Sequence, residues 1–172
     1  MMIEPSLLGV PVEVYLHSSY EPDAEYVDGT IEHRPAPEYD HASWQQAVME
    51  WFWQRTREWN VRVLPSLRVQ VARNRFRVPD VTVLDRNQPI EQIITHSPMA
   101  VFEILSPEDS MMRMTQKLGE YAAMGIPHIW VIDPANRQAW RFHDNQLNLA
   151  SSFGDPGDKI HFDLAEIEKL LD

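Results

Sequence analysis

MAVFEILSPEDSMMRMTQKLGEYAAMGIPHIWVID, residues 99–133, contains two apolar runs separated by an amphipathic stretch. The first run, 99–105, is apolar on both faces except for one glutamate, which is typical of a central, buried strand. Ser106-Pro107-Glu108-Asp109 predicts the opening of a helix, which Gly125 is placed to stop. A second apolar strand is expected at 128–132. This strand–helix–strand unit predicts two parallel strands joined by a crossover helix.

The flanking segments predict a mixed sheet with helices packed against it. Strands are expected at 12–15, 30–32, 67–71, 76–84 and 159–162, and helices from Asp40, the expected N-cap, and from Asp163. Residues 72–75 and 143–145 predict hairpin turns. Pro79 interrupts the 76–84 strand, which indicates an edge position or a local bulge. The fold class is therefore α/β.

Length and composition narrow the class of protein. The chain has 172 residues, 44% hydrophobic and 24% charged, as in an ordinary globular protein. This length predicts a single domain over 1–172, with its core at about 15–140 and a C-terminal hairpin, strand and short helix at 141–172. The absence of cysteine excludes disulfides and thiolate zinc sites. No apolar stretch approaches the roughly 20 residues of a membrane span, so we expect a soluble, cytoplasmic protein with no membrane partner.

Charge is unevenly distributed along the chain. The net charge of −11 argues against non-specific coating of nucleic acid. Residues 55–77 nevertheless carry seven arginines and one acid, so this segment is +6 and the remainder, by difference, is −17. The segment is either a solvated arginine-rich surface or a local patch that faces phosphate groups on an acidic protein.

Two carboxylates stand at positions that apolar residues would otherwise fill. Asp80 stands near the start of a predicted strand segment, after a proline. Glu103 has Phe102 and Ile104 as its strand neighbours. Burying an ionised carboxylate is costly unless it is paired or bound to a cation. If the strands are neighbours, the carboxylates can converge on one hard cation such as Mg²⁺, which could activate water and stabilise charge on a phosphoryl group. A buried structural ion pair is the alternative interpretation.

Lys117 lies on the predicted helix after the Glu103 strand, beside an apolar stripe of Met114, Leu118 and Tyr121. A lysine in this position can extend its stem over core surface and keep its charge in solvent. It can also reach back to the carboxyl end of the preceding strand, where parallel α/β sheets commonly place their sites. There it would orient a water nucleophile or neutralise phosphate charge.

A set of short motifs occurs in a fixed order along the chain. They are Glu25-Tyr26-Val27-Asp28-Gly29, His41 at a helix opening, Pro79-Asp80, Glu103-Ile104-Leu105-Ser106-Pro107, Lys117-Leu118-Gly119-Glu120-Tyr121 and Gly125-Ile126-Pro127-His128-Ile129-Trp130-Val131-Ile132-Asp133. Together they resemble the bacterial restriction endonuclease family called Uma-two, which belongs to the PD-(D/E)XK nuclease superfamily. The resemblance runs from about Tyr15 to Trp140, which is most of the chain.

The resemblance implies a restriction-endonuclease-like mixed β-sheet core flanked by helices, and hydrolysis of nucleic-acid phosphodiesters with Mg²⁺ or Mn²⁺ as cofactor. It implies that Asp80, Glu103 and the backbone carbonyl of Ile104 bind the metal. The superfamily's lysine usually lies two residues after the glutamate, where this chain has Leu105. In the Uma-two pattern a helix lysine takes its place, and Lys117 matches it.

Three further positions relate to this pattern. Glu25 precedes a Val-Asp-Gly turn, so it is either a further metal ligand or a structural residue. His41 is either a substrate-contacting or acid/base group or an ordinary helix-terminal histidine. Family members often carry an acidic residue four positions before the helix lysine, where this chain has Arg113.

The leading hypothesis is a metal-dependent endonuclease that acts on nucleic acid, in the first place DNA. The alternative is a nuclease-fold domain with little catalysis that serves as a nucleic-acid-binding or assembly module. A glycosidase using Asp80 and Glu103 as its acid/base pair is a third interpretation. Trp53, Trp59 and Trp140 are expected to be exposed, which predicts a homodimer.

Overall fold

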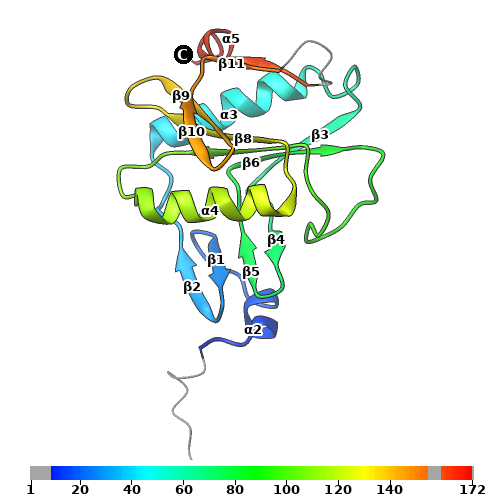
Figure 1. The fold of residues 1–172 in the computed structure, drawn as a ribbon, viewed down its shortest axis with the longest axis vertical. Coiled ribbons are helices and arrows are strands. Elements are labelled where there is room, and N and C mark those ends of the chain that lie inside the picture. Colours follow the sequence, from blue (N-terminus) through cyan, green and yellow to red (C-terminus); the bar gives the residue numbers. More distant parts are fainter. Residues whose placement is uncertain (1–8, 155–159, 172) are drawn as a thin grey trace, which may run out of the picture.

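The computed structural model describes residues 9–154 and 160–171 and is built around a six-stranded mixed sheet (Figure 1). In spatial order its strands are β10 (Gln146–Leu149), β9 (Gln138–His143), β8 (His128–Asp133), β7 (Ala100–Ile104), β6 (Val81–Asp85) and β3 (Val61–Pro65). Helix α3 (Tyr39–Trp53) covers one face and α4 (Met111–Met124) the other. The predicted α/β class is confirmed.

Smaller elements complete the structure. A four-stranded antiparallel sheet has the order β2 (Thr30–His33), β1 (Ala24–Val27), β5 (Arg75–Arg77) and β4 (Val69–Ala72), and a short helix α2 (Val12–Leu16) precedes it. Two short strands, β11 (Ser152–Phe153) and β12 (Phe162–Asp163), pair before the final helix α5 (Leu164–Glu168). In Figure 1 the small sheet lies beyond α4, and α5 lies on the side of α3.

The predicted crossover unit is present as β7, α4 and β8. The two strands pair in parallel, from Ala100 opposite His128 to Ile104 opposite Ile132. Gly125 ends α4 in the left-handed conformation, with φ of 95°, as its position after the helix predicted. The predicted helix opening at 106–109 was wrong, because these residues form a turn in which the Ser106 N–H donates to Asp109 Oδ2 at 2.7 Å.

Helix α4 begins instead at Met111. The hydroxyl of Ser110 accepts from the Arg113 N–H, and this N-cap satisfies a backbone donor that the preceding turn leaves free. The helix buries Met114 and Leu118 against Val101 and neighbouring residues of the sheet. The stripe predicted for this helix is therefore its core-facing side.

The predicted strand 76–84 is two strands in different sheets. β5 belongs to the small sheet and β6 to the large one, and the chain crosses between them at 78–80. Pro79 cannot donate a ladder hydrogen bond, so the pairing ends there. The expected edge or bulge at Pro79 was wrong, because the proline marks a change of sheet. This crossing places Asp80 between the two sheets.

Two predictions near the N-terminus were also wrong. Residues 12–15 form the helix α2 and not a strand, because Tyr15 packs against Tyr26 and Phe76 and its hydroxyl donates to the Ala24 carbonyl at 2.7 Å. Tertiary packing thus overrides the alternating pattern.

Asp40 is not the cap of α3. The helix begins at Tyr39 after an extended Glu38, so Asp40 lies in the first turn, where its charge favours the helix dipole.

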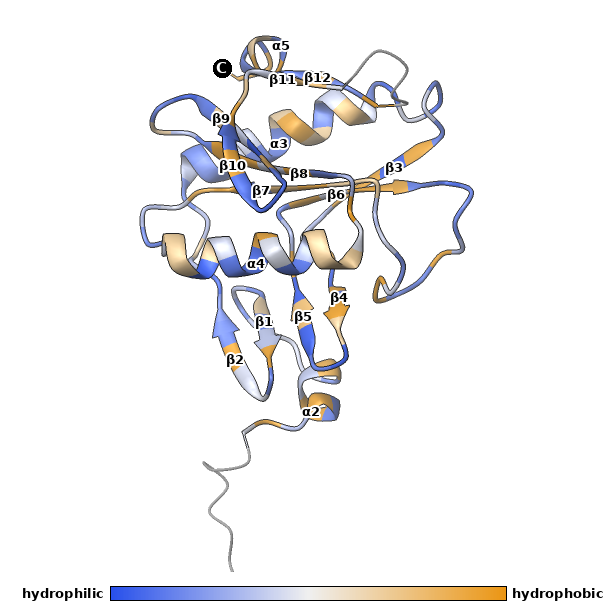
Figure 2. Cartoon of the chain, viewed as in Figure 1, coloured by the Kyte–Doolittle hydropathy of each residue, from blue (hydrophilic) through white to orange (hydrophobic). Residues whose placement is uncertain are grey.

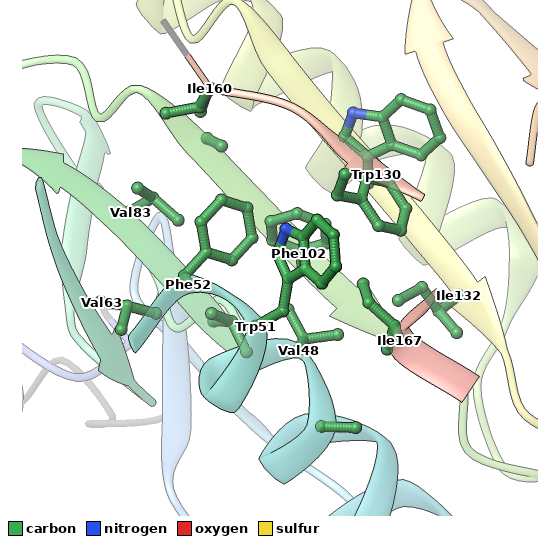
Figure 3. Close-up of a cluster of buried hydrophobic side chains, with 14 of the residues drawn as sticks. Val48, Trp51, Phe52, Val63, Val83, Phe102, Trp130, Ile132, Ile160 and Ile167 are labelled. Atoms are coloured by element: carbon green, nitrogen blue, oxygen red, sulfur yellow. The ribbon is translucent and has the colours of Figure 1, made fainter. Parts of the chain in front are cut away.

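The main core lies between α3 and the large sheet (Figure 3). Val48 and Phe52 of α3 are completely buried, and the Phe52 ring lies 5.5 Å from that of Phe102 on β7. Burial of one such aromatic side chain stabilises the fold by about 1.5–3 kcal/mol. Figure 2 shows the matching apolar colouring of β6, β7 and β8, the central strands of the large sheet.

The C-terminal elements close this core. The predicted hairpin through 143–145 is formed by β9 and β10. Of the predicted strand 159–162, Lys159 lies outside the described residues, and β12 begins at Phe162. The short helix predicted from Asp163 is α5, and the carboxylate of Asp163 accepts from the Ala165 N–H at 2.9 Å and caps it.

The aromatic residues expected at the surface divide into three cases. Trp53 is 67% exposed, whereas Trp140 is half-buried. The prediction for Trp59 was wrong, because its ring packs against Phe52 and His161 and only 7% of the residue is exposed. In the part of the chain that the structure describes, no helix combines the length and apolar content needed to cross a membrane.

Candidate active site

One cleft of about 550 Å³ collects every site residue that the sequence predicted. The cleft is lined by Glu25, His41, Asp80, Glu103, Ile104 and Lys117, together with Arg34 and Arg113. Three of these, Glu25, Asp80 and Glu103, are buried carboxylates from different strands or strand junctions, and we call them the carboxylate triad. Residues far apart in the sequence therefore meet where the two sheets and the two long helices adjoin.

Asp80 and Glu103 come from adjacent strands. Asp80 directly precedes β6, which pairs antiparallel with β7 so that Val81 lies opposite Phe102. The backbone N–H of Ile104 donates to Asp80 Oδ2 at 2.7 Å. This bond fixes the aspartate beside the strand that carries Glu103. The two side chains face the same cleft, as the burial argument predicted.

Lys117 points into the cleft and not to solvent. Its Nζ lies 3.0 Å from Glu25 Oε1 and 3.7 Å from Glu103 Oε1, and only 12% of its side chain is exposed. Burial works to lower the pKa of Lys117, but Glu103 and Glu25 outweigh it and the pKa is raised. Lys117 is therefore a protonated donor, and the solvent-seeking alternative was wrong.

A second cation, Arg34, contacts the opposite end of the triad. Its Nη2 forms an ion pair and hydrogen bond with Asp80 Oδ1, and His41 Nε2 lies 3.2 Å from the same oxygen. Burial alone would raise the pKa of Asp80, but Arg34, His41 and the Ile104 N–H stabilise the anion and lower it. Asp80 is thus held ionised by three donors.

The contact with Asp80 also changes the pKa of His41. Burial works to lower its pKa, but the hydrogen bond and charge of Asp80 outweigh burial and raise it. Its Nδ1 is buried and has no hydrogen-bond partner among the described residues. The ring therefore lines the cleft with Nε2 beside Asp80, whereas Nδ1 is buried.

Glu25 has partners on both of its oxygens. Oε1 accepts from Lys117 and from the Val78 N–H at 3.0 Å, and Oε2 accepts from Arg77 at 3.1 Å. Arg77 is itself buried and also binds Glu32 and Glu120. Glu25 therefore links the cleft to a buried ion-pair network that anchors the small sheet.

Glu103 is the least compensated member of the triad. Burial, the largest effect, and the nearby charges of Asp80 and Glu25 raise its pKa to about 7, although Lys117 opposes the shift. The hydroxyl of Tyr121 donates to Glu103 Oε1 at 2.7 Å. Three cations contact the triad: Arg34 at Asp80, Lys117 at Glu25 and Glu103, and Arg77 at Glu25. Arg77 also binds Glu32 and Glu120, so it is shared between the triad and its neighbours.

The donor set fits a hard divalent cation. Carboxylate and carbonyl oxygens are the ligands of Mg²⁺ and Mn²⁺, and Asp80, Glu103 and Ile104 can supply them from neighbouring strands. Within residues 9–154 and 160–171, however, no group of three or more acidic, histidine or cysteine side chains is already arranged as a metal cage. The carboxylates are oriented by protein cations instead.

The arginine-rich segment does not line the cleft. Arg77 and Arg75 bind carboxylates, Arg68 donates to the carbonyls of Leu16 and Ser18, and Arg55 stacks on a tryptophan ring. None of the seven arginines at 55–77 is among the residues that line the cleft. These four arginines thus have structural partners, and the phosphate-facing interpretation of the segment gains no support.

Sequence reasoning missed two residues of the site. Arg34 lies in a proline-rich loop between β2 and α3, where no periodic pattern exists to assign it a face. Tyr121 was assigned to an apolar stripe, although a buried tyrosine usually needs a polar partner for its hydroxyl. That need was the only signal available, and it identifies no particular acceptor.

The sequence profile of the Uma2 family, described as "Putative restriction endonuclease", matches residues 12–164. The chain belongs to the Uma2 family. The resemblance predicted from the ordered motifs is thereby confirmed, and membership supports a nuclease-like function for this cleft. Families of this restriction-endonuclease-like kind generally use divalent metals.

A solved structure shares the fold. A crystal structure described as a putative nuclease belonging to DUF820, from Anabaena variabilis ATCC 29413, superposes with a TM-score of 0.78 at 21% identity, covering 92% of this chain and 97% of the other. The Uma2 chain therefore has the restriction-endonuclease-like fold. A DrdV–DNA complex matches 75% of this chain and 10% of its own at 17% identity and a TM-score of 0.42. No curated protein matches the sequence.

Proposed function

We propose that this Uma2 protein is an endonuclease that hydrolyses phosphodiester bonds of DNA with Mg²⁺ or Mn²⁺. The observation that carries the proposal is the carboxylate triad and a buried lysine facing one cleft in a member of this family. Oxygen donors for a metal and a fixed positive charge are the two requirements of metal-assisted phosphodiester hydrolysis.

Asp80, Glu103 and the carbonyl of Ile104 would hold the metal. The bound metal would supply an activated water and stabilise the charge that develops on the phosphate. The protein contributes orientation: the Ile104 N–H fixes Asp80, and Tyr121 and Lys117 fix Glu103. These contacts keep the carboxylates in place before substrate binds, which limits the reorganisation needed during reaction.

Lys117 would act as a charged donor. Because its pKa is raised, it remains protonated and does not accept a proton from water. Its ammonium instead orients the attacking water or binds the scissile phosphate. Glu25 contacts Lys117 at 3.0 Å and is also held by the buried Arg77 and by the Val78 N–H, so we assign it to positioning Lys117. His41 would contact substrate from its place in the lining of the cleft.

The assembly proposed for this protein is a homodimer. Trp53, Tyr39 and Leu64 are exposed apolar side chains on or beside α3, and most soluble oligomers are symmetric dimers. DNA is the proposed nucleic-acid partner. The buried position of Trp59 removes one of the arguments for the dimer but leaves the surface of α3 available.

A cleavage assay tests the proposed function. Supercoiled plasmid is incubated with the protein in Mn²⁺, in Mg²⁺ and in EDTA, beside the variants Glu103→Gln and, as a matched control, Glu166→Gln. Glu166 is an exposed glutamate on α5 that pairs with Lys169 outside the cleft. We expect metal-dependent nicking that Glu103→Gln abolishes and Glu166→Gln preserves. DNA binding without any cleavage would instead favour the binding-module alternative.

A further inference from the structure

Every acceptor oxygen of Asp80 is occupied by the protein itself. Oδ2 accepts from the Ile104 N–H, and Oδ1 is contacted by both Arg34 and His41. The bond to Ile104 belongs to the backbone of a buried strand, so Oδ2 is not free to turn away. Oδ1, on the side that Arg34 covers, is therefore the oxygen that a side-chain movement alone can open to a metal.

Arg34 compensates the negative charge of Asp80. Its guanidinium lies against Asp80, with Glu103 and Glu25 also close enough to stabilise it, and 15% of its side chain is exposed. Together with Lys117 and Arg77 it compensates the negative charge of the carboxylate triad. Because two cations on one carboxylate oxygen repel each other, Arg34 and a divalent metal compete for this position.

Arg34 also has room to leave. It belongs to the loop between β2 and α3, and residues 34–37 line two clefts: the active-site cleft and a neighbouring cleft of about 480 Å³. Arg34, His41 and Asp80 line both, so the two clefts adjoin at the ion pair. Rotation of one long side chain would carry the guanidinium from the first cleft toward the second without moving a strand.

We propose that Arg34 is a displaceable placeholder, which holds Asp80 in ligand position and must vacate Oδ1 before a divalent metal binds there. This inference rests on the proposed metal-dependent function and adds a positioning residue to it. Arg34 thereby keeps the buried Asp80 anion compensated while no metal is bound. The same contact weakens metal affinity, because each binding event must break it.

The test is the affinity for Mn²⁺, measured by calorimetry without DNA. We expect Arg34→Gln to bind Mn²⁺ about tenfold more tightly than the parent, within the roughly 5–150-fold range of typical coupling between sites. Arg113→Gln is the matched control, because Arg113 lines the same cleft, carries the same charge and has an exposed side chain on α4. It should change the affinity less than threefold.

A second measurement does not depend on the folding of a variant. In crystals of the parent protein soaked in Mn²⁺, we expect the ion on Asp80 Oδ1 and the Arg34 guanidinium turned toward the neighbouring cleft. Equal Mn²⁺ affinity of the parent and Arg34→Gln, or bound Mn²⁺ with the Arg34–Asp80 contact intact, would overturn the placeholder role while leaving the nuclease proposal standing. Failure of both proteins to bind Mn²⁺ would overturn the two together.

Discussion

The hydroxyl of Tyr121 donates a 2.7 Å hydrogen bond to Glu103 Oε1, and Lys117, one helical turn earlier on α4, approaches the same oxygen. Positions four apart lie on one face of a helix, so the helix presents a neutral and a charged donor to a single carboxylate. The crossover from β7 through α4 thus builds part of the site as well as part of the core.

Replacing Lys117 by methionine should impair turnover. Lys117→Met keeps the apolar stem and removes the charge, so we expect a loss of about 2–4 kcal/mol of transition-state stabilisation, typical of removing a preorganised electrostatic group. Plasmid nicking in Mn²⁺ measures it. Lys169→Met, which alters an exposed lysine paired with Glu166, is the control and should retain full activity. Full activity of a folded Lys117→Met protein would remove the lysine from the mechanism.

The Arg34–Asp80 pair should be detectable as a coupling in stability. Asp80→Asn leaves a largely buried guanidinium without its carboxylate, and we expect it to lower the free energy of unfolding by about 3 kcal/mol. The double variant Arg34→Gln/Asp80→Asn should recover about half of this loss. Urea denaturation of the four proteins gives the coupling. Strict additivity of the two single changes would show that the pair contributes no net interaction.

The central part of the fold was predictable because its signals are local. The apolar runs at 99–105 and 128–132 and the stop at Gly125 are consecutive in sequence, and a crossover between parallel strands has few alternatives. Buried acids are costly, so Asp80 and Glu103 are conspicuous from the amino-acid sequence alone. The start of α4 was less well predicted, since Ser106 and Ser110 could each serve as its N-cap.

The remainder depends on long-range contacts. Arg34 is separated from Asp80 by 46 positions, and no local pattern joins a proline-rich loop to a strand junction that far away. The separation of β5 from β6 at Pro79 follows from the pairing partners available on each side, not from the residues of the run. Residues around Tyr15 likewise form the helix α2 because the Tyr15 ring packs against Tyr26 and Phe76.

Glu25→Gln should separate positioning from ligation. If Glu25 holds Lys117 and is not a ligand, its amide variant should change Mn²⁺ affinity less than threefold while turnover falls about tenfold or more, because Lys117 loses its closer anionic partner. Calorimetry and plasmid nicking on the same protein give the two values. Parallel losses of Mn²⁺ affinity and turnover would show that Glu25 is a metal ligand.

Trp53 should contribute to self-association. The side chain is 67% exposed beside Met49 and Pro65, which line the same shallow apolar cleft on α3. We expect light scattering to report twice the 20.1 kDa monomer mass for the parent and the monomer mass for Trp53→Gln. Ile90→Gln, which alters a similarly exposed apolar residue away from α3, should leave the dimer intact. A monomeric parent at micromolar concentration would contradict the proposed homodimer.

Glu103 should make the metal-free protein less stable as pH rises. Its pKa is raised from an ordinary 4.5 to about 7, so between these values the folded state binds more protons than the unfolded state, and stability falls with increasing pH. The groups that face it are Lys117, Tyr121 and the other two members of the carboxylate triad, with Arg34. Asp80 and Glu25 have lowered pKa values, so they act in a separate, more acidic window in which stability is lost as pH falls.

In EDTA, Glu103→Gln should therefore raise the melting temperature by several degrees at pH 8 and have little effect at pH 4.5. Saturating Mn²⁺ should remove most of the difference at pH 8 by stabilising the parent alone. An equal effect of Glu103→Gln at both pH values would mean that the carboxylate of Glu103 is ionised throughout and is already compensated by Lys117.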